Sequence, residues 1–216
     1  MALYNFEETK MKKRQLIFIH GGEAFSKYDD FISYLKTQEI ELHRAPSNRW
    51  HKHLQEDLGE EWEVIKPAMP NAQNAKYEEW KIWFERYFTF LNEEVVLIGH
   101  SQGGMFLTKY LIENKTPFTV KALFLVGSVH NSSATFNDSL EDGGDFGYDD
   151  TEIPLLAKKI EHIYIAHSKD DFVVPFEQGE KLAKALPEAE FMVFEDKNHF
   201  LIDEFPELID KIRNLE

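Results

Sequence analysis

The chain has 216 residues, a formal net charge of −15 at pH 7 and no cysteine. The negative charge disfavours nucleic acid and anionic membrane surfaces as partners, because both are negatively charged themselves. The lack of cysteine excludes disulfide bonds, cysteine-zinc sites and thiol catalysis.

The stretch from Met1 to Gln15 is polar and charged, and it lacks the apolar segment of a secretory signal. No apolar run in the sequence approaches the length of a membrane span. We therefore expect a cytoplasmic protein, and the cysteine-free composition fits a reducing compartment. The length predicts a single domain over residues 1–216.

Six short apolar runs alternate with amphipathic stretches along the chain. Continuous apolar runs of this length are typical of strands buried on both faces, as in a parallel sheet. Their alternation with helices predicts an α/β fold, a three-layer sandwich with a mainly parallel sheet of about six strands and helices on both faces. The runs lie at residues 16–19, 62–65, 95–98, 122–126, 163–166 and 191–194.

Two segments show the apolar period of helices. Between the second and third runs, large apolar residues recur at helical spacing from Trp80 to Leu91, which predicts one core-facing helix. The same spacing from Phe205 to Leu215 predicts a last helix, with Pro206 in its first turn.

Residues 42–60 interrupt this pattern, and we interpret them as a short helix inserted before the second strand. His51 and His53 in this segment could ligate a metal. However, no nearby carboxylate or third histidine has recognisable ligand spacing. We therefore expect two solvent-facing histidines and no metal site.

Residues 128–152 are also irregular, and their second half is rich in aspartate, glutamate and glycine. They do not match the EF-hand calcium loop. The composition is typical of a solvated, mobile loop. The alternative is a small lid beside an active site, where its charge would disfavour anionic substrates.

The sequence Gly-His-Ser-Gln-Gly at residues 99–103 lies between the third apolar run and a stretch with helical spacing. A G-x-S-x-G pentapeptide between a strand and a helix is typical of a nucleophile elbow, in which the serine occupies a sharp, strained turn at the sheet edge. Ser101 is therefore the candidate nucleophile. A plain glycine-rich turn between strand and helix is the alternative interpretation.

Candidates for an acid and a base follow in the chain order that elbow-type hydrolases use. A serine nucleophile needs a base to take its proton and a carboxylate to orient that base. The acid candidate is Asp171, just past the fifth apolar run, and we expect its neighbour Asp170 to be a turn or cap residue. The base candidate is His199, which lies between the last strand and the last helix.

An oxyanion hole would need two backbone N–H groups directed at the developing charge. The amide of Gln102, directly after the nucleophile, is one candidate. The second is the amide of Gly22 in the loop after the first strand, with Glu23 as the alternative.

Three further histidines lie at strand ends. His20 and His100 occupy tight turns, where we expect structural roles. His130 also follows a strand end and could contact substrate.

Together these motifs resemble the α/β-hydrolase fold superfamily, and the similarity extends from Leu16 to the last helix. Within it, the chain is similar to the small serine hydrolases related to retinoblastoma-binding protein 9. Those proteins also have a Met-Pro segment after the second strand, followed by a helix with tryptophan. The segments that carry the resemblance are His20-Gly21-Gly22, Met69-Pro70-Asn71, Gly99-His100-Ser101-Gln102-Gly103, the Asp-Asp-x-Val-Val-Pro stretch at 170–175, and Asn198-His199-Phe200.

The resemblance implies a Ser101, Asp171 and His199 triad, hydrolysis of carboxylic esters and no large cap domain. The 42–60 segment and the acidic 128–152 loop do not correspond to features of that family, so we expect them to shape the substrate pocket.

We expect a serine hydrolase that cleaves a small-molecule carboxylic ester, or a thioester or amide, through an acyl-enzyme on Ser101. No metal and no organic cofactor is required. The alternative function is a catalytically silent module of the hydrolase fold that binds a small ligand or a protein partner. The natural substrate and the oligomeric state do not follow from the sequence.

Overall fold

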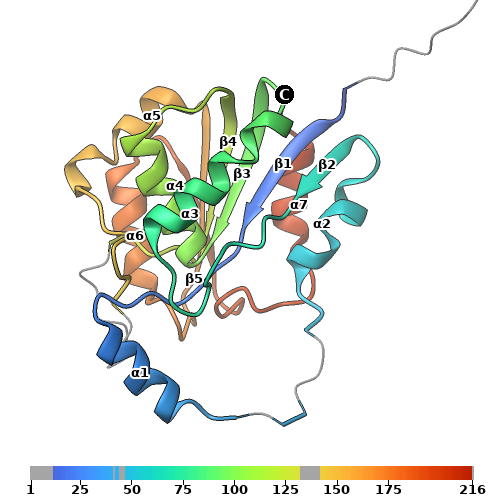
Figure 1. Cartoon of the computed structure of the whole chain (residues 1–216). Helices are drawn as coiled ribbons and strands as arrows, with labels where there is room; N and C mark the ends of the chain where they lie inside the picture. Colours follow the sequence, from blue (N-terminus) through green and yellow to red (C-terminus); the bar gives the residue numbers. More distant parts are fainter. Residues whose placement is uncertain (1–11, 41, 44–46, 132–141, 216) are drawn as a thin grey trace, which may run out of the picture.

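The computed structural model describes residues 12–40, 42–43, 47–131 and 142–215. Within these residues, six strands form one sheet in the order β2-β1-β3-β4-β5-β6 (Figure 1). All neighbouring strands are parallel, which confirms the predicted α/β fold. The strands are β1 (Arg14–Ile19), β2 (Trp62–Ile65), β3 (Glu94–His100), β4 (Thr119–Val126), β5 (His162–Ser168) and β6 (Glu190–Phe194).

Each of the six predicted apolar runs lies within one of these strands. The central strands are buried on both faces, and in β1 every residue from Gln15 to Ile19 is buried. The edge strands β2 and β6 are only partly buried. Glu63, which interrupts the second apolar run, is exposed in β2.

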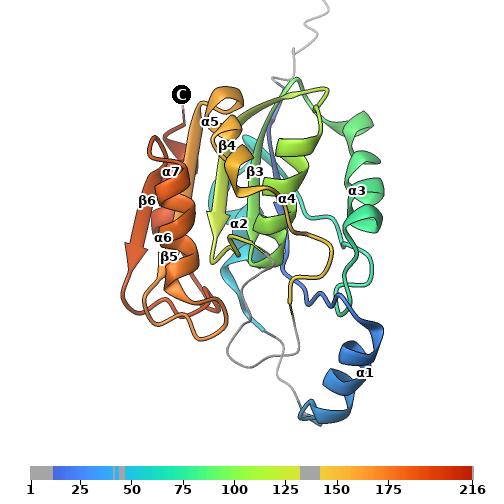
Figure 2. The same ribbon diagram turned by 90° about the vertical axis from the view of Figure 1, so that its left-hand side faces the viewer.

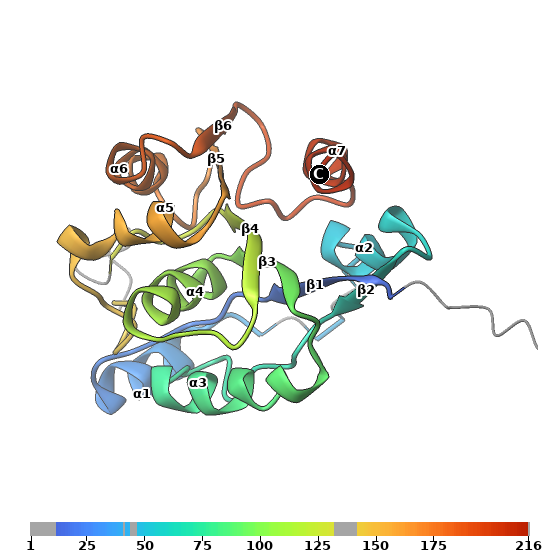
Figure 3. The same cartoon turned by 90° about the horizontal axis from the view of Figure 1, so that it is seen from above.

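Helices cover both faces of the sheet, as the view from above shows (Figure 3). Helices α3, α4, α5 and α6 cover one face, and α2 and α7 cover the other. Helix α1 has no buried residue and extends from the end of the molecule at which the strands terminate (Figures 1 and 2). The helices are α1 (Tyr28–Thr37), α2 (Trp50–Leu58), α3 (Tyr77–Glu85), α4 (Gln102–Glu113), α5 (Leu155–Lys159), α6 (Phe176–Ala185) and α7 (Pro206–Arg213), with 3-10 turns η1 (Phe88–Phe90) and η2 (Asp150–Glu152).

The short helix predicted within residues 42–60 and the predicted C-terminal helix are α2 and α7, which pack against each other and the sheet. Pro206 occupies the start of α7, as expected. Leu54 of α2 and Leu208 of α7 are fully buried in this layer. Burial of each such leucine contributes about 1.5–3 kcal/mol to stability.

The predicted helix from Trp80 to Leu91 is only partly correct. Helix α3 ends at Glu85, and the chain continues as the 3-10 turn η1. The N–H of Tyr87 bonds to the carbonyl of Phe84, and this tighter bonding ends the α-helix. Trp80 and Phe84 are buried as predicted, but Trp83 is 37% exposed and lies outside the core.

The expectation of a solvated loop over residues 128–152 is wrong for residues 142–152. Phe146 is completely buried against Trp80 and Phe106. The acidic residues here make specific hydrogen bonds, and Asp145 accepts one from the N–H of Tyr77 at 2.9 Å. Buried aromatic residues between the carboxylates therefore attach this segment to the core. Residues 132–141, on which part of the prediction falls, lie outside the described residues.

The strand order reverses between β1 and β3, because β1 leads to β2 on one side and has β3 on the other. The loops that leave β1 and β3 therefore start side by side at the carboxyl ends of the strands. In open α/β sheets, ligands bind at this switch point. Among the described residues, no helix is long and apolar enough to cross a membrane.

Candidate active site

Ser101 occupies a strained turn at the end of β3. Its φ of 54° and ψ of −125° lie in a region that side-chain-bearing residues rarely adopt, at a cost of about 1–3 kcal/mol. The residue is held there by its N–H, which donates to the carbonyl of Val126 at 2.9 Å. Ser101 directly precedes helix α4, but its hydroxyl makes no capping hydrogen bond. The turn therefore leaves the hydroxyl available for chemistry.

The start of α4 packs tightly against the end of β1. A Cβ atom on Gly103 would collide with the backbone carbonyls of Ile19 and His20. Only glycine allows this close approach. It brings the serine turn next to the loop after β1, which contains the expected oxyanion donor.

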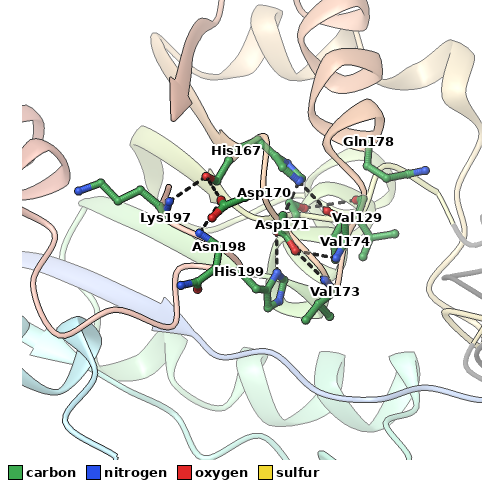
Figure 4. A network of polar contacts seen from close by, with 12 residues as sticks. Val129, His167, Asp170, Asp171, Val173, Val174, Gln178, Lys197, Asn198 and His199 are labelled. Atoms are coloured by element: carbon green, nitrogen blue, oxygen red, sulfur yellow. Dashed lines mark hydrogen bonds and ion pairs between the residues drawn. The ribbon is translucent and has the colours of Figure 1, made fainter. Parts of the chain in front are cut away.

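Asp171 and His199 form a buried hydrogen-bonded pair (Figure 4). Asp171 Oδ2 lies 2.8 Å from His199 Nδ1, and the two residues are 8% and 5% exposed. The other carboxylate oxygen, Oδ1, accepts the N–H groups of Val173 and Val174 at 2.9 and 2.8 Å. These bonds fix the carboxylate so that it holds Nδ1–H of the imidazole and leaves Nε2 for the pocket.

Asp170 lies in the turn after β5, as expected, and its side chain bonds to groups other than the imidazole. Its Oδ1 accepts the hydroxyl of Ser168 at 2.6 Å and the N–H of Asn198 at 2.8 Å. Ser168 Oγ in turn accepts the N–H of Lys197 at 2.9 Å. Asp170 thus ties the end of β5 to the loop that carries His199, while Asp171 contacts the imidazole itself.

Sequence reasoning missed two residues beside this pair. His167 is fully buried, and this burial lowers the pKa of its imidazole. Its Nε2 lies 3.0 Å from the carbonyl of Val174 and 3.6 Å from Asp171 Oδ2. Gly127 has a φ of 51°, and a Cβ there would lie 3.3 Å from the ring of His199. The position of His167 four residues before Asp171 was a usable signal. Gly127 offered none, because its contact spans 72 residues of sequence.

The two candidate amides in the loop after β1 differ in their hydrogen bonds. The N–H of Glu23 donates to the carbonyl of Ala72 at 2.8 Å, so this amide is already occupied. In the described part of the chain, the N–H groups of Gly22 and Gln102 have no hydrogen-bond acceptor. The geometry therefore leaves Gly22 and Gln102 as the free donors.

A cavity of about 340 Å³ joins these groups. Ser101 and His199 both line it, which brings the candidate nucleophile and base to the same space. Within the described ranges, neither Ser101 Oγ nor His199 Nε2 makes a hydrogen bond, so both atoms are free to meet a ligand. The cavity is lined by Gly21, Gly22, Glu23, Ala72, Gln73, His100, Ser101, Val173 and His199.

Residues 42–211 match the family model described as Serine hydrolase. The chain belongs to the serine hydrolase family. It is 28% identical over 169 residues to the YdeN protein of Bacillus subtilis (strain 168), with 76% of this chain and 85% of that protein covered. It is also 25% identical over 154 residues to serine hydrolase RBBP9 of Rattus norvegicus, with 71% and 78% covered.

Solved structures agree with this assignment at the level of the fold. The crystal structure of the ydeN gene product from B. subtilis superposes with a TM-score of 0.69 at 21% identity, covering 93% of this chain and 97% of that one. The meta-cleavage product hydrolase CumD of Pseudomonas fluorescens IP01 gives a TM-score of 0.62 at 15% identity, covering 94% and 90%. The chain therefore has the α/β-hydrolase fold.

The other histidines of this serine hydrolase have distinct environments. His20 Nε2 accepts the N–H of Met69 at 2.9 Å, which links the loop after β1 to the Met-Pro segment. His100 Nε2 lies 3.0 Å from the carbonyl of His199. His130 lies 3.9 Å from Asp150 and is not among the residues that line the cavity with Ser101. Its expected contact with substrate is therefore not part of this cavity.

The His51 and His53 pair is not fully solvent-facing as expected, since both side chains are partly buried. His51 stacks on Phe18, and burial together with Lys66 lowers its pKa to about 4. His53 Nε2 lies 2.7 Å from Asn48 Oδ1. No group of three or more histidine, aspartate or glutamate side chains in the described residues has the arrangement of a metal site.

Proposed function

We propose that this serine hydrolase cleaves a carboxylic ester through an acyl-enzyme on Ser101, with His199 as the base and Asp171 as the acid of the triad. The observation that carries this proposal is the Asp171–His199 hydrogen bond, which leaves His199 Nε2 facing a cavity that Ser101 also lines. The separate hydrogen bonds of Asp170 favour Asp171 as the acid. A thioester or an amide could react through the same steps.

In the first half of the reaction, Ser101 Oγ attacks the ester carbonyl and its proton passes to His199 Nε2. The backbone N–H groups of Gly22 and Gln102 stabilise the negative charge on the carbonyl oxygen. Loss of one such donor typically raises the barrier by about 3–4 kcal/mol. The imidazolium then protonates the leaving alcohol, and the acyl group stays on Ser101.

In the second half, His199 takes a proton from water, which attacks the acyl carbonyl. The acid product leaves, and Ser101 Oγ recovers the proton from His199. We infer that the Ser101–His199 hydrogen bond forms when substrate occupies the cavity, since catalytic hydrogen bonds often tighten only in the substrate complex.

The cavity of about 340 Å³ favours a small-molecule ester. The net charge of −15 disfavours nucleic acid and anionic membranes as partners of this enzyme. The absence of cysteine from the sequence fits a location in the cytoplasm. The triad chemistry needs no metal and no organic cofactor.

Labelling with a fluorophosphonate probe, followed by peptide mapping, tests the nucleophile. We expect one label on Ser101 in the native protein, none in Ser101→Ala, and hydrolysis of p-nitrophenyl butyrate only by the native protein. Ser128→Ala is the control, since Ser128 is a buried serine close to α4 and its loss should leave labelling intact. A native protein without label or turnover would instead support a catalytically silent binding module.

A further inference from the structure

The loop that carries His199 has a strained backbone on both sides of the histidine. Asn198 has a φ of 43° and Phe200 a φ of 52°. A bulky residue such as phenylalanine rarely adopts this left-handed conformation, and such residues persist only where surrounding contacts hold them. Asp170 and Ser168 hold the N-terminal side of the loop through the N–H groups of residues 197 and 198. A second set of contacts is needed on the C-terminal side.

Trp50, the first residue of α2, provides two of those contacts. Its indole Nε1–H donates to the carbonyl of Phe200 at 3.0 Å, and its backbone N–H donates to the carbonyl of Ile202 at 3.0 Å. The side chain is only 1% exposed, and its ring meets Phe205 edge-on at a centroid distance of 5.6 Å. Trp50 is therefore a rigid, buried donor to the part of the loop that directly follows His199.

His100 provides the third contact. Its Nε2 lies 3.0 Å from the carbonyl of His199, and its ring lies 4.9 Å from the ring of His199. A neutral imidazole protonated at Nε2 makes this bond as a donor. The ring of Trp50 lies edge-on to the ring of His100, at a centroid distance of 6.4 Å. Three backbone carbonyls, those of His199, Phe200 and Ile202, are thus held by two aromatic side chains and one backbone amide.

We propose that Trp50 is a positioning residue that holds the His199 loop in its catalytic conformation, and that the start of helix α2 serves this purpose. The inference rests on the proposed function, because it assigns Trp50 to the orientation of the proposed base. Removal of the indole N–H leaves the carbonyl of Phe200 buried without a donor and loosens the loop. His199 Nε2 then points less accurately at Ser101, and small errors of placement at a reacting group lower kcat strongly.

Trp50→Phe tests the proposal, because phenylalanine keeps an aromatic ring at this position and lacks the N–H donor; the loss of the second ring is shared by the control below. We expect kcat for p-nitrophenyl butyrate to fall roughly tenfold or more, with KM within about twofold, and the rate of inactivation by a fluorophosphonate to fall by the same factor. Trp62→Phe is the matched control. Trp62 is 2% exposed on the same face of the sheet, and within the described residues its indole N–H has no acceptor. It should leave kcat unchanged.

Amide hydrogen exchange of residues 197–202 separates this proposal from the proposed function. Exchange there should speed up in Trp50→Phe and not in Trp62→Phe, whether or not the protein hydrolyses the chosen ester. If Trp50→Phe is too unstable to purify, benzothienylalanine at position 50 preserves the shape of indole without the N–H and should give the same results. Equal exchange or equal kcat in the variants at positions 50 and 62 would overturn the positioning role. A native protein without turnover or label would overturn the proposed function, while the exchange data would still decide whether Trp50 restrains the loop.

Discussion

Asp171 Oδ2 lies 2.8 Å from His199 Nδ1, and the two residues are brought together from loops that are 28 positions apart in the sequence. The other oxygen of Asp171 is occupied by two backbone N–H groups. Oδ2 is therefore the oxygen of the carboxylate that bonds to the imidazole. The pair therefore has the geometry of an oriented base and its acid.

Asp171→Asn should lower kcat about 10³–10⁴-fold with the fold intact, because the amide stabilises the wrong tautomer of His199. Steady-state turnover of p-nitrophenyl butyrate measures the effect, and circular dichroism checks the fold. Asp170→Asn is the control. Its hydrogen bonds go to Ser168 and Asn198 rather than to the imidazole, so we expect a much smaller loss. Equal losses in both variants would show that the acid has been assigned to the wrong aspartate.

The backbone strain at Ser101 should appear as a difference in unfolding free energy between two inactive variants, Ser101→Gly and Ser101→Ala. Glycine tolerates the observed backbone angles, so Ser101→Gly relieves about 1–3 kcal/mol of strain, while its more flexible unfolded chain costs about 0.4–1 kcal/mol. Ser101→Gly should therefore be more stable than Ser101→Ala by roughly 1 kcal/mol in urea unfolding. At the exposed Ser33 within helix α1, the glycine variant should instead be the less stable of the two, because glycine weakens a helix by about 1 kcal/mol relative to alanine. The same order at both positions would contradict strain at Ser101.

The strands and the serine turn could be predicted because their signals are local. Strands buried on both faces require unbroken apolar runs, and the runs at 16–19 and 95–98 make up most of β1 and β3. Ser101 stood out because a pentapeptide between a strand and a helix defines the turn on its own. Asp171 and His199 were expected from chain order and from their position after predicted strands. Gln102 was expected because it directly follows Ser101, and Gly22, with Glu23 as the alternative, because it lies in the loop after the first strand.

The supporting contacts could not be predicted because they join residues that are far apart in the sequence. Trp50 and Phe200 are separated by 150 positions, and neither residue type indicates a partner. Composition was also misleading for residues 142–152. Their acidic residues suggested a solvated loop, whereas the buried rings of Phe146 and Tyr148 attach the segment to the core. The hydrogen bond from the Glu23 N–H to the carbonyl of Ala72, which favours Gly22 as the free amide, joins residues 49 positions apart and has no signal in the sequence.

Gly22→Ala should disable the oxyanion hole. A Cβ at this position would lie 2.6 Å from the carbonyl of Ala72, so the loop after β1 must shift and its free N–H moves with it. We expect kcat to fall about 10²–10³-fold with KM little changed, since the donor acts mainly in the transition state. Glu23→Gln is the matched control, because it keeps the shape of the side chain and the hydrogen bond from the backbone N–H of residue 23 to the carbonyl of Ala72. A Gly22→Ala variant with native kcat would exclude Gly22 as the donor.

The stability of the protein should fall in acid because of His100. Burial, followed by the nearby His199, lowers the pKa of His100 to about 3, while the unfolded chain has a value near 6.5. His51 and Arg49 act in the same direction, and the hydrogen bond to the His199 carbonyl opposes them. Above pH 6.5 both states are neutral at this position, so the contribution of His100 to stability is complete. Below pH 6.5 the unfolded state binds a proton that the folded state does not, and this contribution is lost progressively toward pH 3.

Urea unfolding at pH 7, 6 and 5 measures this dependence. One such histidine adds a slope of up to about 1.4 kcal/mol per pH unit to the free energy of unfolding once the unfolded state is protonated. His100→Gln removes the titrating group and keeps a side-chain amide that can donate to the His199 carbonyl. The variant should therefore lose less stability between pH 7 and pH 5 than the native protein does. If the unfolding free energies of the two proteins fall in parallel with pH, His100 takes up a proton in the folded state as readily as in the unfolded one. Its ring would then not be the neutral donor that the His199 loop requires.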